Sequence, residues 1–293
     1  MKFMSITPKA VVSVLLALPL FVLSCGKVNT DDEGGSTAEP AASGWMELPQ
    51  DISDDDLHWV KHYMTLGGNL VRNWSCCYSY SDKISYWVAY PLNKAYIGSY
   101  FGRSDAWAYD PDVPSQYQYN VTSTYGGGWT RGHQIPSADR QGNYEINAST
   151  YYSTNMTPQE YTFNGGTWAS LEGQVRNWAL KSDTLYVVTG AVPSNKTTSS
   201  GVNIPEAYFK ALLRYMPGST IGIDGYCGLA FWFNHSQWSG SEVSVNSGMA
   251  ISISDLEKKL GYDLFPNLHT LIGNSKAKKV KQENPQKVSW WWN

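Results

Sequence analysis

The sequence has few cysteines, and none of them has the spacing of a zinc site. Only four occur in 293 residues, Cys25, Cys76, Cys77 and Cys227, and no two are separated by the two residues typical of structural zinc sites. This excludes a zinc site of that type. Beyond Cys25, the odd number allows either a bridge from the adjacent pair to Cys227 or three buried unpaired thiols.

The chain also lacks an excess of positive charge. It has 22 Lys and Arg residues against 25 Asp and Glu, and the first 24 residues contribute two of the lysines and none of the acids. Bulk charge therefore gives no sign of a nucleic-acid binder, and any polyanion site must be a local patch. With 42% hydrophobic and 14% aromatic residues and no internal repeat, residues 45–293 are predicted to form one domain.

No hydrophobic run is long enough for an ordinary membrane span. Residues 1–24 place Lys2 and Lys9 before "AVVSVLLALPLFVLS", which predicts a secretory signal peptide. The run stops at "FVLSCGK", which resembles a bacterial lipobox despite the imperfect Leu23, so Cys25 is expected to carry a lipid. The alternative is ordinary signal cleavage that leaves an incidental thiol.

The segment after Cys25 is small, polar and acidic. Residues 25–44 contain no apolar pattern that could pack, and they are expected to form a flexible tether. The acidic "DDE" resembles a surface-export cue of some Gram-negative lipoproteins. We therefore expect an exported protein that is lipid-anchored in the bacterial outer membrane and displayed at the cell surface.

The remaining sequence predicts an α+β fold. Residues 54–66 have helical character, residues 102–128 are rich in turn formers and predict a surface loop, and residues 254–261 predict a helix opened by Ser254. A short strand is expected at the start of "WTRGHQIPSADR" (129–140), followed by an irregular stretch to Gln159. Core strands are predicted from apolar, β-rich runs at 68–80, 83–92, 184–192, 208–216 and 226–234.

One helix can be argued from spacing. In "NGGTWASLEGQVRNWALK" (164–181) four apolar residues share one face of a helical wheel: Trp168, Leu171, Val175 and Trp178. Glu172 and Arg176 lie on the flank of this stripe, and Asn164 is the expected N-cap. The helix would thus present a carboxylate and a guanidinium beside its buried face.

Three blocks in this order carry a family resemblance. "RGHQIPSADR", "YSTNMTPQ" and "FNGGTWASLEGQVR" resemble the DNA/RNA non-specific endonucleases, the ββα-metal nucleases that include mitochondrial endonuclease G. The resemblance covers about residues 65–270. It implies a ββα-metal nuclease fold and cleavage of DNA and RNA with Mg²⁺, with Mn²⁺ or another divalent cation as alternatives.

The resemblance implies a role for seven residues. His133 falls on the general base that takes a proton from the attacking water, Asn164 on the single protein ligand of a hydrated Mg²⁺, and Asn155 on an asparagine that shapes the site. A neutral histidine with an ordinary pKa near 6.5 suits the first role, and an amide oxygen suits the second. The other four would hold water of the hydrated ion or contact phosphate: Arg103, Arg131, Glu172 and Arg176.

One position departs from the family pattern. The family signature usually has aspartate before Arg-Gly-His, and this chain has Thr130. A hydroxyl accepts hydrogen bonds from the ion's water less strongly than a carboxylate does, which favours the alternative of a surface lipoprotein that binds nucleic acid or glycan without turnover. Intact His133 and Asn164 favour the enzyme.

Other features receive no chemical role from the sequence. The remaining histidines lack metal-ligand spacing, apart from an i,i+4 pair at His58 and His62 without the glutamate and third ligand of a zinc protease. Residues 276–281 predict a solvated basic tail, and the terminal "SWWWN" predicts packed aromatic surface. The histidines concerned are His58, His62, His235 and His269.

Overall fold

A seven-stranded antiparallel sheet organises the computed structural model, which describes residues 44–292 apart from 53, 100–101, 124 and 238–242. The strand order is β1-β2-β3-β6-β7-β8-β9, and a separate ribbon pairs β4 with β5. The large sheet comprises β1 (Leu57–Leu66), β2 (Asn69–Ser79), β3 (Ile84–Leu92), β6 (Thr184–Val192), β7 (Ala207–Tyr215), β8 (Tyr226–Asn234) and β9 (Ala250–Ile251). The predicted α+β class is confirmed.

The helix expected at 54–66 is wrong, because these residues form β1. The strand pairs with β2 along its whole length, from Leu57 opposite Ser79 to Leu66 opposite Asn69. Gly67 and Gly68 both have positive φ and form the tight turn between the two strands. The apolar residues of this segment recur at helical spacing by coincidence. The double glycine that follows, which is typical of a turn between two strands, was the stronger indication of its structure.

The predicted core strands at 68–80, 83–92, 184–192, 208–216 and 226–234 are confirmed as β2, β3, β6, β7 and β8. The short strand at the RGH motif is confirmed as β4 (Trp129–His133). The stretch expected to be irregular up to Gln159 also contains α2 (Tyr144–Ser149) and β5 (Met156–Glu160). Gly132 is required in β4, because a Cβ there would overlap the Gln159 side chain.

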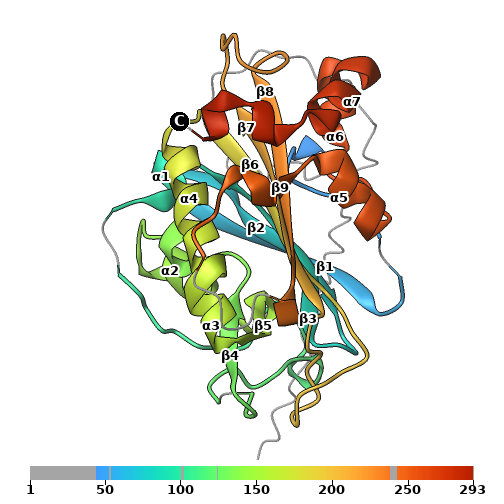
Figure 1. Cartoon of the computed structure of the whole chain (residues 1–293). Helices are drawn as coiled ribbons and strands as arrows, with labels where there is room; N and C mark the ends of the chain where they lie inside the picture. The colour runs from blue at the N-terminus through green and yellow to red at the C-terminus, as the bar shows by residue number, and fades with distance from the viewer. Residues whose placement is uncertain (1–43, 53, 100–101, 124, 238–242, 293) are drawn as a thin grey trace, which may run out of the picture. The chain divides into compact units, whose positions relative to one another are not determined.

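Helices cover both faces of the large sheet (Figure 1). One face packs against α4 (Ala169–Leu180), and the other against α5 (Ile253–Leu260), α6 (Asn267–Ile272) and α7 (Asn274–Gln282). The predicted apolar stripe is confirmed, since its four side chains are at most 1% exposed: Trp168, Leu171, Val175 and Trp178. This burial fixes α4, and hence its polar flank, relative to the sheet.

Two predicted helix starts are wrong. The cap of α5 is Ser252, whose hydroxyl accepts a hydrogen bond from the Asp255 amide, rather than Ser254. Asn164 is not an N-cap, because the helix begins at Tyr161 with the Glu160 carboxylate as its cap. The chain then passes through α3 (Tyr161–Phe163), a π-helical turn, η5 (Asn164–Trp168), and α4.

The expected surface loop and basic tail are both partly buried. The described residues of 102–128, which leave out 124, have little regular structure apart from η2 (Ser115–Tyr117), but they bury Val113 and Val121 in the core. Residues 276–281 belong to α7, and Lys281 is 2% exposed and paired with Glu257 and Asp263. Local charge patterns predicted solvent exposure, whereas long-range packing decides it.

The chain's last residues pack as expected from their aromatic content. Trp291 is buried, and the Trp178 indole donates to its backbone carbonyl over 2.7 Å. The predicted signal peptide, Cys25 and all of the tether before Gly44 lie outside the described residues. Within the part of the chain that the structure does describe, no helix has the length and hydropathy needed to cross a bilayer.

The three described cysteines are buried free thiols, so the predicted alternative of a disulfide is wrong. Cys76 and Cys77 lie on β2 and Cys227 lies on β8, with β3, β6 and β7 between them. Four strand spacings correspond to about 19 Å. A disulfide requires its Cα atoms to lie within about 7 Å.

We predict that reductant leaves the thermal stability unchanged. A native bridge usually contributes about 2–4 kcal/mol, and its loss from a domain of this size would lower Tm by roughly 4–16 °C. Thermal unfolding followed by circular dichroism, with and without dithiothreitol, checks this. A fall in Tm within that range would contradict the assignment of free thiols.

Candidate active site

Five of the seven predicted site residues line one cavity. It has a volume of about 330 Å³ and lies where β4, residues 136–141 and the start of the α3–α4 helix meet. The five are Arg103, Arg131, His133, Asn164 and Glu172. We call this cavity the RGH pocket. Segments that are 30 to 70 residues apart in sequence thus bring their polar side chains to one place.

His133 ends β4 and is held between two aromatic rings. Its imidazole lies 5.6 Å from the Trp107 ring and 5.0 Å from the Tyr151 ring, measured between centroids. Removal from water, with the charges of Arg103 and Arg131, lowers the pKa of His133 to about 3. Its Nε2 is buried without a hydrogen-bond partner among the described residues. The ring is therefore neutral near pH 7 and able to accept a proton.

Asn164 is oriented by Thr130, the residue that replaces the usual aspartate. The amide nitrogen of Asn164 donates to the Thr130 hydroxyl over 3.0 Å, and that hydroxyl donates to the Gln159 carbonyl over 3.0 Å. With its nitrogen engaged, Asn164 has its Oδ1 available as an acceptor in the RGH pocket. Thr130 thus fixes the amide directly, a role that the sequence comparison did not suggest.

Two arginines give the RGH pocket its positive charge. Arg131 is on β4, its guanidinium stacks 3.9 Å from the Trp107 ring centroid, and it donates to the Val121 carbonyl over 2.8 Å. Arg103 comes from the loop before it and is 59% exposed, with an ion pair to Asp105. The first guanidinium is fixed in place and the second is open to solvent, and both suit a phosphate.

Glu172 lies on the first turn of α4 at the edge of the RGH pocket, above a buried lysine. Lys210, on the β7 face that α4 covers, is fully buried and lies 4.7 Å from the Trp168 ring centroid. Its Nζ has no hydrogen-bond partner among the described residues. Burial raises the pKa of Glu172 and lowers that of Lys210, while the opposite charge of each counteracts the shift of the other.

Sequence reasoning missed Lys210. Its only signal was a charged residue at an inward position of a largely apolar strand, "YFKALLRY", which also contains Arg214. A buried cation is costly unless it is compensated, and the acidic side chains that compensate it are those of Glu172 and Asp139. Lys210 therefore supplies positive potential below the RGH pocket.

Two predicted residues lie outside the RGH pocket. Arg176, one turn after Glu172, pairs with Asp139 over 3.0 Å, and Asp139 also accepts from the Tyr90 hydroxyl. Asn155 is fully buried, and its amide donates to and accepts from the backbone of Ile135. Arg176 thus ties α4 to the segment after β4, and Asn155 braces the turn that follows His133.

A histidine to which the sequence assigned no chemistry lies between two carboxylates. His62 Nε2 is 2.9 Å from Asp110 and its Nδ1 is 3.4 Å from Asp112, a His/Asp/Asp cluster of the kind that can hold a metal. Asp110 also accepts from the Thr154 hydroxyl and the Asp112 amide. Burial acts to raise the pKa of Asp110, but these hydrogen bonds and His62 lower it overall. These hydrogen bonds favour a structural tie between β1 and the 110–112 segment.

The chain is similar to known nucleases. The model of the DNA/RNA non-specific endonuclease family matches residues 61–271. A nuclease of Nostoc sp. is 28% identical over 94% of this chain and 99% of its own length. The mitochondrial nuclease EXOG of Mus musculus is 26% identical over 67% of this chain, which spans 56% of that protein. A nuclease of Serratia marcescens is 26% identical over 71% of this chain and 75% of its own length.

A solved structure shares the fold. The EndoG chain from a complex with the inhibitor EndoGI superposes with a TM-score of 0.60 at 17% identity, covering 79% of this chain and 94% of that one. In this chain β4, β5 and α4 form the ββα unit that the sequence resemblance implied. The predicted ββα-metal nuclease fold is confirmed.

We predict that His133 stays neutral at pH values well below the usual pKa of histidine. The ring-carbon chemical shifts of isotopically labelled protein should remain those of neutral imidazole from about pH 8 to about pH 5, because burial and two guanidiniums oppose protonation. Arg103→Gln should raise the pKa. A titration midpoint near the ordinary value of about 6.5 in the wild type would rule out this environment.

Proposed function

The chain belongs to the DNA/RNA non-specific endonuclease family and is a nuclease, and on that premise we propose that it hydrolyses phosphodiester bonds of DNA and RNA with Mg²⁺ and with His133 as general base. The observation that carries the proposal is the convergence of a neutral imidazole, two guanidiniums and an oriented amide oxygen in the RGH pocket. These are the groups that phosphodiester hydrolysis requires.

The donors in the RGH pocket fit a hard divalent cation. Asn164 offers Oδ1 because its nitrogen is held by Thr130, and Glu172 adds a carboxylate on the same wall. A Mg²⁺ ion keeps most of its water and needs few protein oxygens, so Asn164 would hold it directly and Glu172 through water. When bound, the cation would supply positive charge for the reacting phosphate.

The protein side chains then divide the remaining work. His133 accepts the proton of the attacking water in its neutral form, and its lowered pKa makes it a weaker base than an ordinary histidine. Arg131 is held by Trp107 and the Val121 carbonyl, so it can bind a phosphate oxygen without losing much side-chain entropy. Lys210 stabilises the ionised form of Glu172 from below.

The absence of sequence specificity follows from the same residues. Charged groups in the RGH pocket recognise phosphate, which DNA and RNA share, and phosphate contacts carry no base information. We propose that the enzyme acts outside the cytoplasm, anchored by lipid at Cys25 in the outer membrane. Digestion of external nucleic acid fits that location.

The His133→Ala variant should lose turnover by roughly 10²- to 10⁴-fold while substrate binding changes little, because the base acts only in the chemical step. Plasmid and RNA cleavage by the full chain, with Mg²⁺ and then with EDTA, measures this. His269→Ala, which changes a partly exposed histidine on α6 outside the RGH pocket, is the control and should keep full activity. Unchanged turnover in His133→Ala would remove this residue from the mechanism.

A wild type that binds nucleic acid but cleaves neither substrate would favour the alternative, a binding lipoprotein. The feature that makes this alternative worth testing is Thr130, which lacks the usual carboxylate. Cleavage that requires both the cation and His133 would exclude a lipoprotein that only binds nucleic acid.

The Thr130→Val variant should require more Mg²⁺ for half-maximal activity. It loses the hydroxyl that accepts from Asn164, and a hydrogen bond of this kind contributes about 0.5–1.5 kcal/mol, so a shift of roughly 2- to 12-fold is expected. Thr130→Ser keeps the hydroxyl and serves as the control. Equal Mg²⁺ titrations for the Val and Ser variants would show that Thr130 does not orient the ligand.

A further inference from the structure

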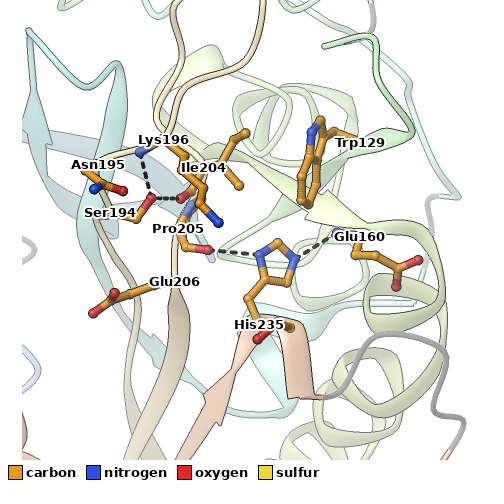
Figure 2. Close-up of a pocket in the computed structure, with 10 residues that line it drawn as sticks. Trp129, Glu160, Ser194, Asn195, Lys196, Ile204, Pro205, Glu206 and His235 are labelled. Carbon is orange, nitrogen blue, oxygen red and sulfur yellow. Dashed lines mark hydrogen bonds between the residues drawn. The ribbon is translucent and has the colours of Figure 1, made fainter.

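A second cavity lies at the opposite end of β4 from His133. It has a volume of about 400 Å³ and shares no lining residue with the RGH pocket. We call it the Trp129 pocket. Figure 2 shows the Trp129 indole on one side and residues 194–196 on the other, with His235 between them. Its wall is formed by Trp129, Glu160, Ser194, Asn195, Lys196, Ile204, Pro205, Glu206, His235 and Ser236.

The two pockets are joined by a single strand. Trp129, Arg131 and His133 occupy every second position of β4, so their side chains lie on the same face of the ribbon. Trp129 and His133 are about 13 Å apart at the usual rise of a strand, which equals about four stacked nucleotide steps. A nucleic-acid strand that is cleaved at His133 and runs along β4 would pass close to Trp129.

The Trp129 pocket has the chemistry of a binding site rather than of a reaction centre. His235 Nδ1 donates to the Pro205 carbonyl, and its Nε2 accepts from the Glu160 amide, each over 2.9 Å, so both ring nitrogens are used. The Ser194 hydroxyl donates to the Ile204 carbonyl over 2.7 Å. Neither side chain is available as a base or a nucleophile.

The indole of Trp129 indicates which part of a nucleotide would enter. Glu160 and Glu206 lie in the wall, but Figure 2 shows their carboxylates directed away from the space between Trp129 and Lys196, and the Glu160 carboxylate caps α3. Lys196 is exposed at the same wall and can meet a phosphate outside it. The half-buried indole of Trp129 offers a stacking surface to a flat group such as a nucleobase.

We propose that the Trp129 pocket is a subsite for one nucleobase of the substrate strand, stacked on Trp129, with an adjoining phosphate at Lys196. The proposal rests on the proposed nuclease function. Stacking tolerates every base, so the subsite adds affinity and sets the position of the strand without adding sequence specificity. Phosphate contacts in the RGH pocket and a stacked base in the Trp129 pocket would together hold the strand at two points.

Binding of fluorescent single-stranded oligonucleotides, long enough to span both pockets, tests the subsite. The full chain is used in EDTA, so that affinity is measured by anisotropy without turnover. Trp129→Ala should weaken binding by roughly 5- to 150-fold, the range of one base–aromatic stack, and Trp129→Phe should restore most of the affinity. Trp232→Ala removes a half-buried indole from the opposite sheet face and should bind like the wild type.

An abasic scan separates base stacking from other causes. One abasic position, moved along the oligonucleotide, should weaken wild-type binding at one place, and there Trp129→Ala should cause no further loss. A loss that is the same at every abasic position would overturn the subsite, as would unchanged affinity in Trp129→Ala. If the wild type cleaves with Mg²⁺ in either of these cases, the subsite alone fails. If it neither binds nor cleaves, the proposed function fails and the subsite with it.

Discussion

The pairing of β4 with β5 is the constraint on which the site depends. Its register sets Arg131 opposite Pro158 and His133 opposite Met156, and β5 ends at Glu160, which caps the following helix. The base and the predicted cation ligand therefore come from one continuous ribbon and helix. Gly132 permits this arrangement, because any larger residue would displace the Gln159 side chain that covers it. A shift of one residue would turn His133 to the other face.

Buried charge holds this ribbon and helix against the large sheet. Asp139 follows β4 and pairs with Arg176 on α4, while Lys210 on β7 lies below Glu172. Loss of one member would leave an uncompensated buried charge, which commonly destabilises a protein by about 3–5 kcal/mol. The same charges set the potential of the RGH pocket, so stability and chemistry are coupled there. A residue can thus matter to the site without lining it.

The sequence predicted the parts of the fold that rest on local patterns. Strongly apolar strands and the stripe on α4 were found, and the RGH motif led to most of the pocket. The pattern at 54–66 matched a helix by coincidence, and the turn at Gly67 and Gly68, with the pairing to β2, makes residues 57–66 a strand. The hydrogen bond from Asn164 to Thr130 and the contacts of His62 are long-range, so no local pattern could reveal them, and Lys210 left only the signal of a charge in a largely apolar strand.

The central claim is that Asn164 holds a divalent cation in the RGH pocket, with Thr130 fixing its amide. Crystals grown with Mn²⁺ and measured at its absorption edge test this most directly. The account predicts a strong anomalous peak bonded to Asn164 Oδ1 on the side that faces Glu172 and His133. A peak at His62 and its two carboxylates, with none at Asn164, would contradict it.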